Sequence, residues 1–349
     1  MEITCESFSW ILTVLVPLFS SPFVPLFLLP WTLFVAWFVY RQFLTSEMIC
    51  ADGKGIYITG CDSGFGHEVA LLFDSLGFHV FAGCLRPCEQ GANFLRAQAS
   101  ERLTILDLDV SDEEKVRLAA KIIRVECTKR GIKLWGLYNN AGISSVGEIE
   151  WLSLDHYRRM LDINFFGTIA VTKSILPMIR ESKGRVVTIT SGLSRMPFPG
   201  RSGYCVAKAA LESFVTCLRY EMTKFGVHCA IIYPGNFVGA TKVFAGVVKL
   251  LDDTIEDMHP DIREVYGPEY IEAFRRRTVS GYSNMSSVST APVVSAVRHA
   301  LLAKYPRVRY RPMDCNWMLY DFILQHFPEE ISDFLVSFYI RWLPRPRFS

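Results

Sequence analysis

The sequence predicts an α/β protein with a doubly wound parallel sheet. Short apolar runs typical of buried strands alternate with longer segments that have the apolar spacing of helices. A glycine-rich turn joins the first of these strands to a helix. Polar motifs follow several strands, at the sheet edge where folds of this kind bind their ligands.

The glycine-rich turn follows the apolar run Gly55–Gly60 and precedes His67–Leu76, which has helical apolar spacing. Gly60 allows a tight turn. Gly64 and Gly66 let the backbone approach a pyrophosphate at the helix N-terminus, where free N–H groups favour anions. This context predicts a dinucleotide site, and a plain strand–helix turn is the alternative.

The second predicted strand, His79–Cys84, has no acidic residue that could bind the adenosine ribose and favour NAD. Arg86 follows two residues later, where it could meet a 2′-phosphate or be solvated. The choice between NAD and NADP therefore stays open.

Two further strands carry polar groups to the same edge. The strand Arg102–Val110 ends near Asp109, and Ser111 is expected to cap the next helix, with Glu114 completing a capping box. The strand Leu134–Tyr138 leads into N-N-A-G.

Tyr204 and Lys208 lie four residues apart, which places them about one turn apart on one face of a predicted helix. A nearby ammonium lowers the pKa of a phenol, so such a tyrosine can exchange a proton with an alcohol or carbonyl near neutral pH. Alone the pair is weak evidence, because a packed ring beside a solvated lysine is common.

Five motifs occur in one unbroken order across roughly residues 53–310: T-G-C-D-S-G-F-G at 59–66, N-N-A-G at 139–142, Asn164, Ser191 and Tyr204/Lys208. Together they resemble the short-chain dehydrogenase/reductase family. The residues around these motifs are similar to those of a membrane-associated branch of the family, which includes D-3-hydroxybutyrate, retinol and hydroxysteroid dehydrogenases. The resemblance implies a Rossmann-type fold, NAD or NADP as cofactor, and hydride transfer between a nicotinamide and an alcohol carbon.

The resemblance also implies a role for each matching residue. Tyr204 would be the acid/base, Lys208 would lower its pKa and hold the ribose hydroxyls, and Ser191 would hydrogen-bond the substrate oxygen. Asn164 would order a water that passes the proton to solvent. The residues implied at the dinucleotide are Gly60, Ser63, Gly64, Phe65, Gly66, Asp109, Asn139, Gly142, Tyr204, Lys208, Pro234 and Gly235.

The N-terminal segment predicts a membrane anchor. From Ser7 to Tyr40 the chain carries no charged residue, and a span needs about 20 apolar residues. One span could cover about Pro22–Leu44, and two shorter segments turning near Ser20 would also fit. Early acidic residues and the lack of Lys or Arg before Arg41 argue against a signal peptide or a mitochondrial presequence. We expect a retained anchor in the endoplasmic reticulum, with a buried apolar helix as the alternative.

Arg41 is the only positive flank near this segment, which places the following domain in the cytosol. The ten cysteines have no paired or metal-ligand spacing and are expected to be reduced apolar fillers, in line with a cytosolic domain. The seven histidines include no H-x-x-x-H pair, so no metal site is predicted.

These patterns divide the chain into an anchor at 1–48, a catalytic domain at 49–312 and an apolar aromatic tail at 313–349. Within the domain, 240–290 is predicted to be a helical insertion that covers the substrate as a lid, with helices at Thr241–Leu251 and Asp261–Arg276. The tail suits a membrane interface, and packing on its own domain fits equally well.

Composition limits the partners. A net charge of +2 and the lack of a basic cluster with interleaved aromatics argue against a nucleic-acid partner. We predict a small-molecule lipid substrate and a membrane as partners. A homodimer is an option, because the helices between Asn164 and Lys208 build an interface in similar proteins.

Three functions stay open. The first is oxidation or reduction of a lipid alcohol or ketone, such as a steroid or retinoid, which suits an anchored enzyme with an apolar lid. The second is D-3-hydroxybutyrate oxidation, which needs a cation for the carboxylate; Arg195 and Arg201 are candidates, with a surface salt bridge as the alternative. The third is a silent membrane scaffold, against which the intact Ser191, Tyr204 and Lys208 argue.

Overall fold

A computed structural model describes residues 24–40, 47–237, 239–241, 243–284, 287, 289–340, 343–344 and 346. Most of the predicted anchor at 1–48 lies outside the described residues, and helix α2 (Val24–Val39) is its main described part. Among the described residues, no helix has both the length and the apolar character needed to cross a membrane.

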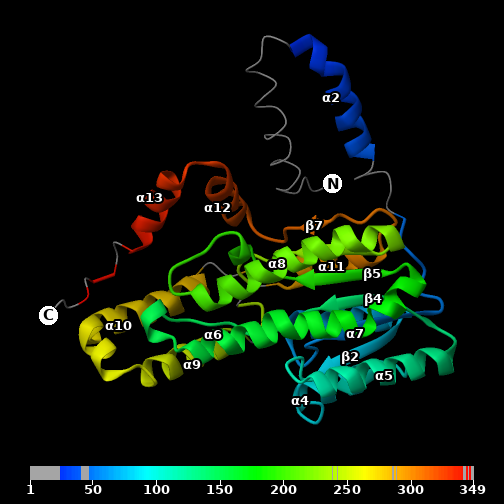
Figure 1. Ribbon diagram of the computed structural model, residues 1–349, viewed down its shortest axis with the longest axis horizontal. Helices are drawn as coiled ribbons and strands as arrows, with labels where there is room; N and C mark the ends of the chain where they lie inside the picture. Colours follow the sequence, from blue (N-terminus) through cyan, green and yellow to red (C-terminus); the bar gives the residue numbers. More distant parts are fainter. Residues whose placement is uncertain are drawn as a thin grey trace.

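Seven parallel strands form one sheet with the order β3-β2-β1-β4-β5-β6-β7 (Figure 1). Their bounds are β1 Lys54–Thr59, β2 His79–Cys84, β3 Leu103–Asp107, β4 Lys133–Asn139, β5 Arg185–Ile189, β6 His228–Ile232 and β7 Arg309–Tyr310. The predicted doubly wound parallel sheet is thus confirmed. The order reverses between β1 and β4, and ligands bind beyond the strand ends at such a switch point.

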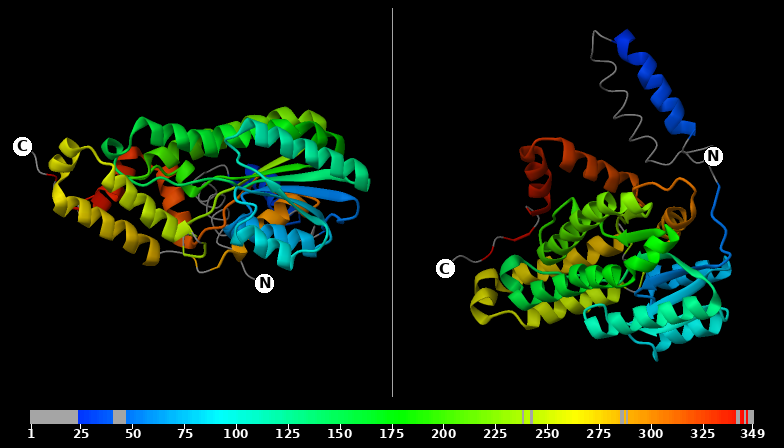
Figure 2. Two further views of the ribbon diagram at one scale, coloured as in Figure 1. Left: turned by 90° about the horizontal axis from the view of Figure 1, so that it is seen from below. Right: turned by 45° about the vertical axis from the view of Figure 1, so that its right-hand side comes forward.

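Helices cover both faces of the sheet, which is why the strands are buried on both sides (Figure 2). One apolar core lies under α5 (Glu113–Arg130), α7 (Gly167–Ser182) and α8 (Ser202–Met222). The other lies under α3 (Gly64–Ser75), α4 (Gln90–Gln98) and α11 (Ala291–Leu302).

A buried arginine ties the sheet to α11. Arg185 in β5 is 5% exposed, its guanidinium donates to the carbonyl oxygens of Ala300 and Ala303, and it lies 5.3 Å from the centroid of the Trp135 ring. The last carbonyls of a helix have no N–H donor within the helix, and the Arg185 guanidinium supplies donors to two carbonyls at the end of α11.

The predicted insertion forms two helices, α9 (Val243–Glu256) and α10 (Pro260–Asn284), both longer than expected from the sequence. An aromatic cluster holds α10 against the loop after β4: the Phe274 ring centroid lies 4.9 Å from that of Trp151. Gly267 interrupts α10 with φ 71° and ψ 159°, a conformation that favours glycine.

The C-terminal tail forms α12 (Cys315–His326) and α13 (Glu329–Ile340), and α12 is joined to the domain by charge. Asp321 in α12 is 3% exposed and lies 3.2 Å from Arg311 and 4.0 Å from Arg195. The apolar side chains of Leu319, Phe327 and Phe334 remain exposed.

Two local expectations are wrong. Asp112, not Ser111, caps α5 by accepting from the N–H groups of Glu114 and Lys115, because the Ser111 hydroxyl instead donates to Asp109. Cys315 is disulfide-bonded, so the cysteines are not uniformly reduced. Eight others in the described part of the chain are free.

His299 in α11 makes folding sensitive to acid. Its Nδ1 lies 2.8 Å from the hydroxyl of Tyr310 in β7. Burial, with the nearby guanidinium groups of Arg307 and Arg185, lowers the pKa of His299 from 6.5 to about 4. Between these values the unfolded chain binds a proton that the folded protein does not, so the free energy of unfolding should fall as pH is lowered through this window.

Chemical denaturation of wild type and His299→Asn across this pH range checks the prediction. The asparagine variant should lose this part of the pH dependence. An equal slope in both proteins would contradict it.

Candidate active site

The glycine-rich turn between β1 and α3 is shaped by backbone that only glycine fits easily. Gly60 and Gly64 have φ values of 70° and 61°. A Cβ on Gly66 would overlap the Gly60 carbonyl and the Asn140 side chain. Ser63 precedes α3 and makes no side-chain cap bond, so the first N–H groups of α3 face an open turn.

The end of β4 is fastened to this turn. The Thr59 hydroxyl accepts from the N–H groups of Asn140 and Ala141, both at 3.0 Å, and the Asn140 amide donates to the carbonyls of Thr59 and Gly60. The Asn139 side chain points into the core instead, where it donates to Thr172 at 2.9 Å. Thr59 and Asn140 are therefore structural residues of the site, to which sequence reasoning gave no role although it quoted their motifs.

An acidic side chain lies at the end of β2, although the strand itself contains none. The Asp62 carboxylate accepts from the N–H groups of Leu85 and Arg86 at 3.0 and 2.9 Å. The Arg86 guanidinium is exposed and pairs with Glu89 at 3.2 Å. Asp109, on the adjoining strand end, accepts from the Ser111 N–H and hydroxyl.

Ser191, Tyr204 and Lys208 meet beyond the end of β5. Ser191 begins the helical turn Gly192–Ser194, and its Oγ accepts from the Leu193 N–H at 3.2 Å. Tyr204 lies in the first turn of α8. One turn later the Lys208 Nζ donates to the Ile189 carbonyl at 3.3 Å and lies 5.7 Å from the centroid of the Tyr204 ring.

Burial sets the protonation of this pair. Lys208 is 3% exposed, and burial lowers its pKa to about 8. Burial raises the pKa of Tyr204, which the Ser191 hydroxyl and the Arg201 charge partly offset. The pKa of Tyr204 is therefore raised overall and not lowered as expected, because desolvation outweighs the Ser191 hydroxyl and the Arg201 charge.

Asn164 lies in a π-helical turn, Asp162–Phe166, between α6 (Leu154–Leu161) and α7. It is fully buried, and its side-chain amide exchanges two 3.0 Å hydrogen bonds with the backbone of Ile143. A Cβ on Gly142 would lie 2.5 Å from Asn164 Oδ1 and 3.4 Å from Lys208 Nζ. Gly142 thus lies between the Asn164 amide and the Lys208 ammonium, and a side chain there would overlap Asn164 Oδ1.

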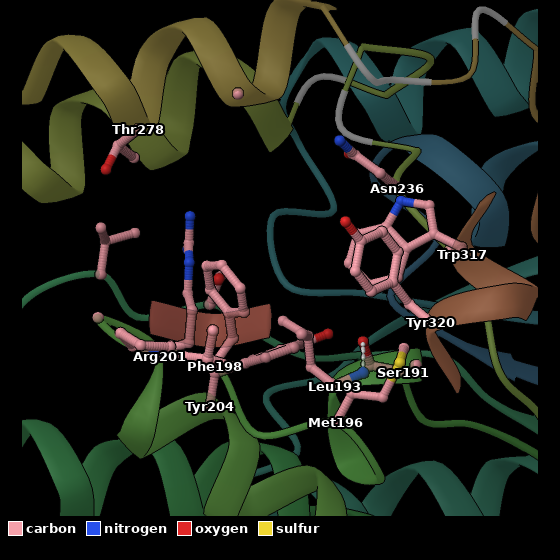
Figure 3. A pocket seen from close by; sticks show the side chains of 18 of the residues that line it. Ser191, Leu193, Met196, Phe198, Arg201, Tyr204, Asn236, Thr278, Trp317 and Tyr320 are labelled. Atoms are coloured by element: carbon pink, nitrogen blue, oxygen red, sulfur yellow. Dashed lines mark hydrogen bonds between the residues drawn. The ribbon is translucent and has the colours of Figure 1, made fainter. Parts of the chain in front are cut away.

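A cavity of about 690 Å³ opens onto Ser191 and Tyr204 (Figure 3). Its walls come from the loop before α8, from α10, and from α12 and α13, and Pro234 and Gly235 also line it. Apolar side chains dominate the lining, among them Val146, Leu193, Met196, Phe198, Val247, Phe274, Trp317, Leu324, Leu335 and Val336.

The two arginines proposed for the substrate have different surroundings. Arg201 lines the cavity, and its Nη1 donates to the Ser145 carbonyl at 3.2 Å. Arg195 is not among the lining residues, and its side chain lies 3.8 Å from Glu212 and 4.0 Å from Asp321. The salt-bridge alternative therefore describes Arg195 better than a substrate role does.

Glu212 lies one turn after Lys208 on α8 and connects three segments that surround the site. It was not singled out in the sequence. It accepts from the Ser194 hydroxyl at 2.8 Å and from the Tyr233 hydroxyl at 2.7 Å, and lies 3.6 Å from Arg309. Its carboxylate thus joins the catalytic helix to the turn after β5 and to the end of β6. The four-residue spacing from Lys208 was the available signal.

The residues present fit a dinucleotide. The positive φ values of Gly60 and Gly64 and the uncapped start of α3 suit a pyrophosphate at the α3 N-terminus. Asp62 lies at the end of β2, where folds of this kind bind the adenosine ribose. Among the described residues, no group of three or more side chains could hold a metal ion.

Comparison with known proteins agrees with this geometry. A family model described as short chain dehydrogenase matches residues 54–248. The chain is 40% identical over 321 residues to the mitochondrial D-beta-hydroxybutyrate dehydrogenase of Bos taurus, which covers 90% of this chain and 89% of that protein. It is 37% identical over 277 residues to retinol dehydrogenase 5 of Mus musculus, in an alignment that covers 79% of this chain and 86% of that protein.

The fold is similar to the crystal structure of a short-chain dehydrogenase from Streptomyces avermitilis, with a TM-score of 0.62 and 25% identity, covering 83% of this chain and 98% of that chain. The chain belongs to the short-chain dehydrogenase/reductase family. It is an oxidoreductase that uses NAD or NADP on an alcohol and its carbonyl.

Replacing the phenol tests the proton role. Tyr204→Phe keeps the ring but removes the group that exchanges the proton, so turnover should fall about 10²- to 10⁴-fold while cofactor affinity is retained. Lys208→Ala should damage both, because it removes the buried cation as well. Nicotinamide absorbance measures turnover, and fluorescence titration measures cofactor affinity. Unchanged turnover in Tyr204→Phe would refute the proton role.

Replacing Glu212 tests the frame behind the site. Glu212→Ala leaves the hydroxyls of Ser194 and Tyr233 without their acceptor, so the free energy of unfolding should fall by about 2–4 kcal/mol and kcat should fall with it. Glu212→Gln keeps an acceptor oxygen and should lose less. Denaturant titration and steady-state kinetics measure both effects. Equal stability of the wild type and the alanine variant would show that these bonds are dispensable.

Proposed function

We propose that this protein oxidises a lipid secondary alcohol, or reduces the corresponding ketone, with a steroid or retinoid as the type of substrate. The observation that carries the proposal is the large, mainly apolar cavity at Ser191 and Tyr204. Cavities of this size bind drug-sized apolar ligands, and a few polar groups at one end fix their orientation.

The catalytic residues act on the substrate oxygen and its proton. Ser191 would donate a hydrogen bond to the oxygen, and Tyr204 would take the hydroxyl proton during oxidation or return it during reduction. Lys208 would hold the ribose hydroxyls, and Asn164 would order a water that leads the proton to solvent. The bound nicotinamide accepts or supplies the hydride.

NAD is the proposed cofactor. The Asp62 carboxylate lies at the end of β2, where an acidic group favours a ribose hydroxyl and repels a 2′-phosphate. The Arg86 guanidinium, the candidate partner for such a phosphate, is paired with Glu89.

A second function, oxidation of D-3-hydroxybutyrate, is favoured by two observations. Arg201 places a cation in the cavity, and the chain is 40% identical to a protein named D-beta-hydroxybutyrate dehydrogenase. A four-carbon acid would fill only a small part of the cavity, which favours the larger substrate. A silent scaffold has no support, because the catalytic residues are intact.

The membrane is proposed as the site of action. The segment 1–48 would anchor the catalytic domain, 49–312, on the cytosolic face of the endoplasmic reticulum. Exposed apolar residues on α12 and α13 would place the tail, 313–349, at the bilayer interface. Figures 1 and 2 show α2, α12 and α13 on the same side of the domain.

The insertion 240–290 is proposed to act as a lid. Val247 on α9 and Phe274, Arg277 and Thr278 on α10 line the cavity, so movement of these helices would change access to Tyr204. A homodimer is proposed through the helices between Asn164 and Lys208, where Phe166 and Val206 are more than half exposed.

A substrate screen tests the proposed function. Purified full-length protein in detergent is assayed with a hydroxysteroid, retinol and 3-hydroxybutyrate, each with NAD and with NADP, with Tyr204→Phe as the control. We expect a lipid alcohol with NAD to give the highest kcat/KM. Turnover of 3-hydroxybutyrate alone would favour the second function, and no turnover of any alcohol would overturn the proposal.

A further inference from the structure

The cavity combines two features that the proposed function does not explain together: a buried guanidinium close to the catalytic phenol and an apolar volume beyond it. We propose that the substrate is a hydroxy acid with an apolar chain longer than that of hydroxybutyrate, and that Arg201 binds its carboxylate. This inference rests on the proposed function, oxidation of a lipid secondary alcohol, and puts an anionic alcohol in place of the neutral steroid or retinoid as the substrate.

Arg201 is positioned by the start of the catalytic helix. It directly precedes α8 and lies three residues before Tyr204, so both side chains leave the same turn. Its guanidinium extends into the cavity beside Phe198 (Figure 3), and it is only 8% exposed. Its charge offsets part of the rise that burial causes in the pKa of the Tyr204 phenol.

This proximity sets the position of the carboxylate on the substrate. A carbinol oxygen held by Tyr204 and a carboxylate held by Arg201 must lie near each other in one molecule. Hydroxy acids with one or two carbons between the carbinol and the carboxylate end satisfy this, and 3-hydroxy acids are the simplest probes. A guanidinium suits the task, since its planar donors match a carboxylate in pairs.

The other cationic candidates differ in position. Arg195 lies outside the lining, near Glu212 and Asp321. Arg277 lines the cavity from α10, on the wall formed by the proposed lid. Of the three, Arg201 is the one at the start of α8, three residues before Tyr204.

The rest of the cavity lining would bind the apolar chain of the substrate. Beyond Arg201 and Tyr204 the cavity continues between Phe274 on α10 and Trp317, Leu324 and Leu335 on α12 and α13. A substrate as short as hydroxybutyrate would leave these side chains without contact to the substrate. Each methylene buried there should raise kcat/KM about fourfold, the ratio that corresponds to about 0.8 kcal/mol.

The reaction leaves the carboxylate unchanged. The carbinol carbon gives a hydride to NAD(P)⁺, the hydroxyl proton leaves through Tyr204, and the carbon–oxygen bond becomes a carbonyl. The oxidised product is the 3-oxo acid, with NAD(P)H and one proton.

A chain-length series tests the proposal. Racemic 3-hydroxybutyrate, 3-hydroxyhexanoate, 3-hydroxyoctanoate and 3-hydroxydecanoate are compared with 2-heptanol, which matches 3-hydroxyoctanoate without its carboxylate. A hydroxysteroid and retinol serve as neutral lipid alcohols. We expect kcat/KM to rise about fourfold per methylene over part of the series, and the eight-carbon acid to exceed 2-heptanol roughly 10- to 150-fold.

Variants of Arg201 test whether this residue binds the substrate carboxylate. Arg201→Met should reduce the ratio of kcat/KM for 3-hydroxyoctanoate over 2-heptanol roughly 10- to 150-fold, whereas Arg201→Lys should keep most of that ratio. Arg276→Met, at an exposed arginine on α10, is the control and should leave the ratio unchanged. Thermal unfolding of each variant detects loss of folding, and decanoate competition against the wild type measures carboxylate binding without a variant.

Each contrary result has a distinct meaning. Steroid or retinol turnover above that of every hydroxy acid would overturn this inference and leave the proposed function standing. A flat chain-length series with good 3-hydroxybutyrate turnover would overturn the apolar-chain part. A fall in the ratio in Arg277→Met but not in Arg201→Met would overturn the assignment to Arg201. No turnover of any alcohol would overturn the proposed function itself.

Discussion

The buried ammonium of Lys208 is the constraint on which the site depends. A cation with 3% exposure is costly unless the surroundings supply acceptors, and here the Ile189 carbonyl does so at the end of β5. Gly142 lies between the ammonium and the Asn164 amide, which the π-helical turn positions, and a side chain at Gly142 would overlap that amide. The sheet edge, the turn and the catalytic helix are thus arranged around one charge.

Local patterns were sufficient to predict the sheet and to single out the residues that we propose to be catalytic. The glycine turn, the N-N-A-G motif and the Tyr204/Lys208 spacing each depend on neighbours within a few residues, so the sequence contains them directly. The structure brings Ser191, Tyr204 and Lys208 together as expected. The direction of the Tyr204 pKa was wrong because burial depends on the whole fold and not on the spacing of two residues.

Residues that act across the sheet could not be predicted in the same way. Asp62 accepts hydrogen bonds from N–H groups that lie 23 and 24 residues from it in the sequence. Glu212 accepts hydrogen bonds from two hydroxyls that lie 18 and 21 residues from it. Asp112 replaced Ser111 as the helix cap because Asp109 competes for the serine hydroxyl. The cavity draws walls from loops, α10 and the tail, so its size follows from tertiary packing alone.

The tail is joined to the catalytic frame through charge. Asp321 on α12 lies near Arg311 and Arg195, and Arg195 also lies near Glu212 on the catalytic helix. Deleting α12 would remove the Asp321 carboxylate from both guanidinium groups and would remove one wall of the cavity. A recombinant protein truncated after the sheet is therefore an unsuitable substitute for the intact enzyme, and an affinity tag fused directly to the last helix carries a similar risk.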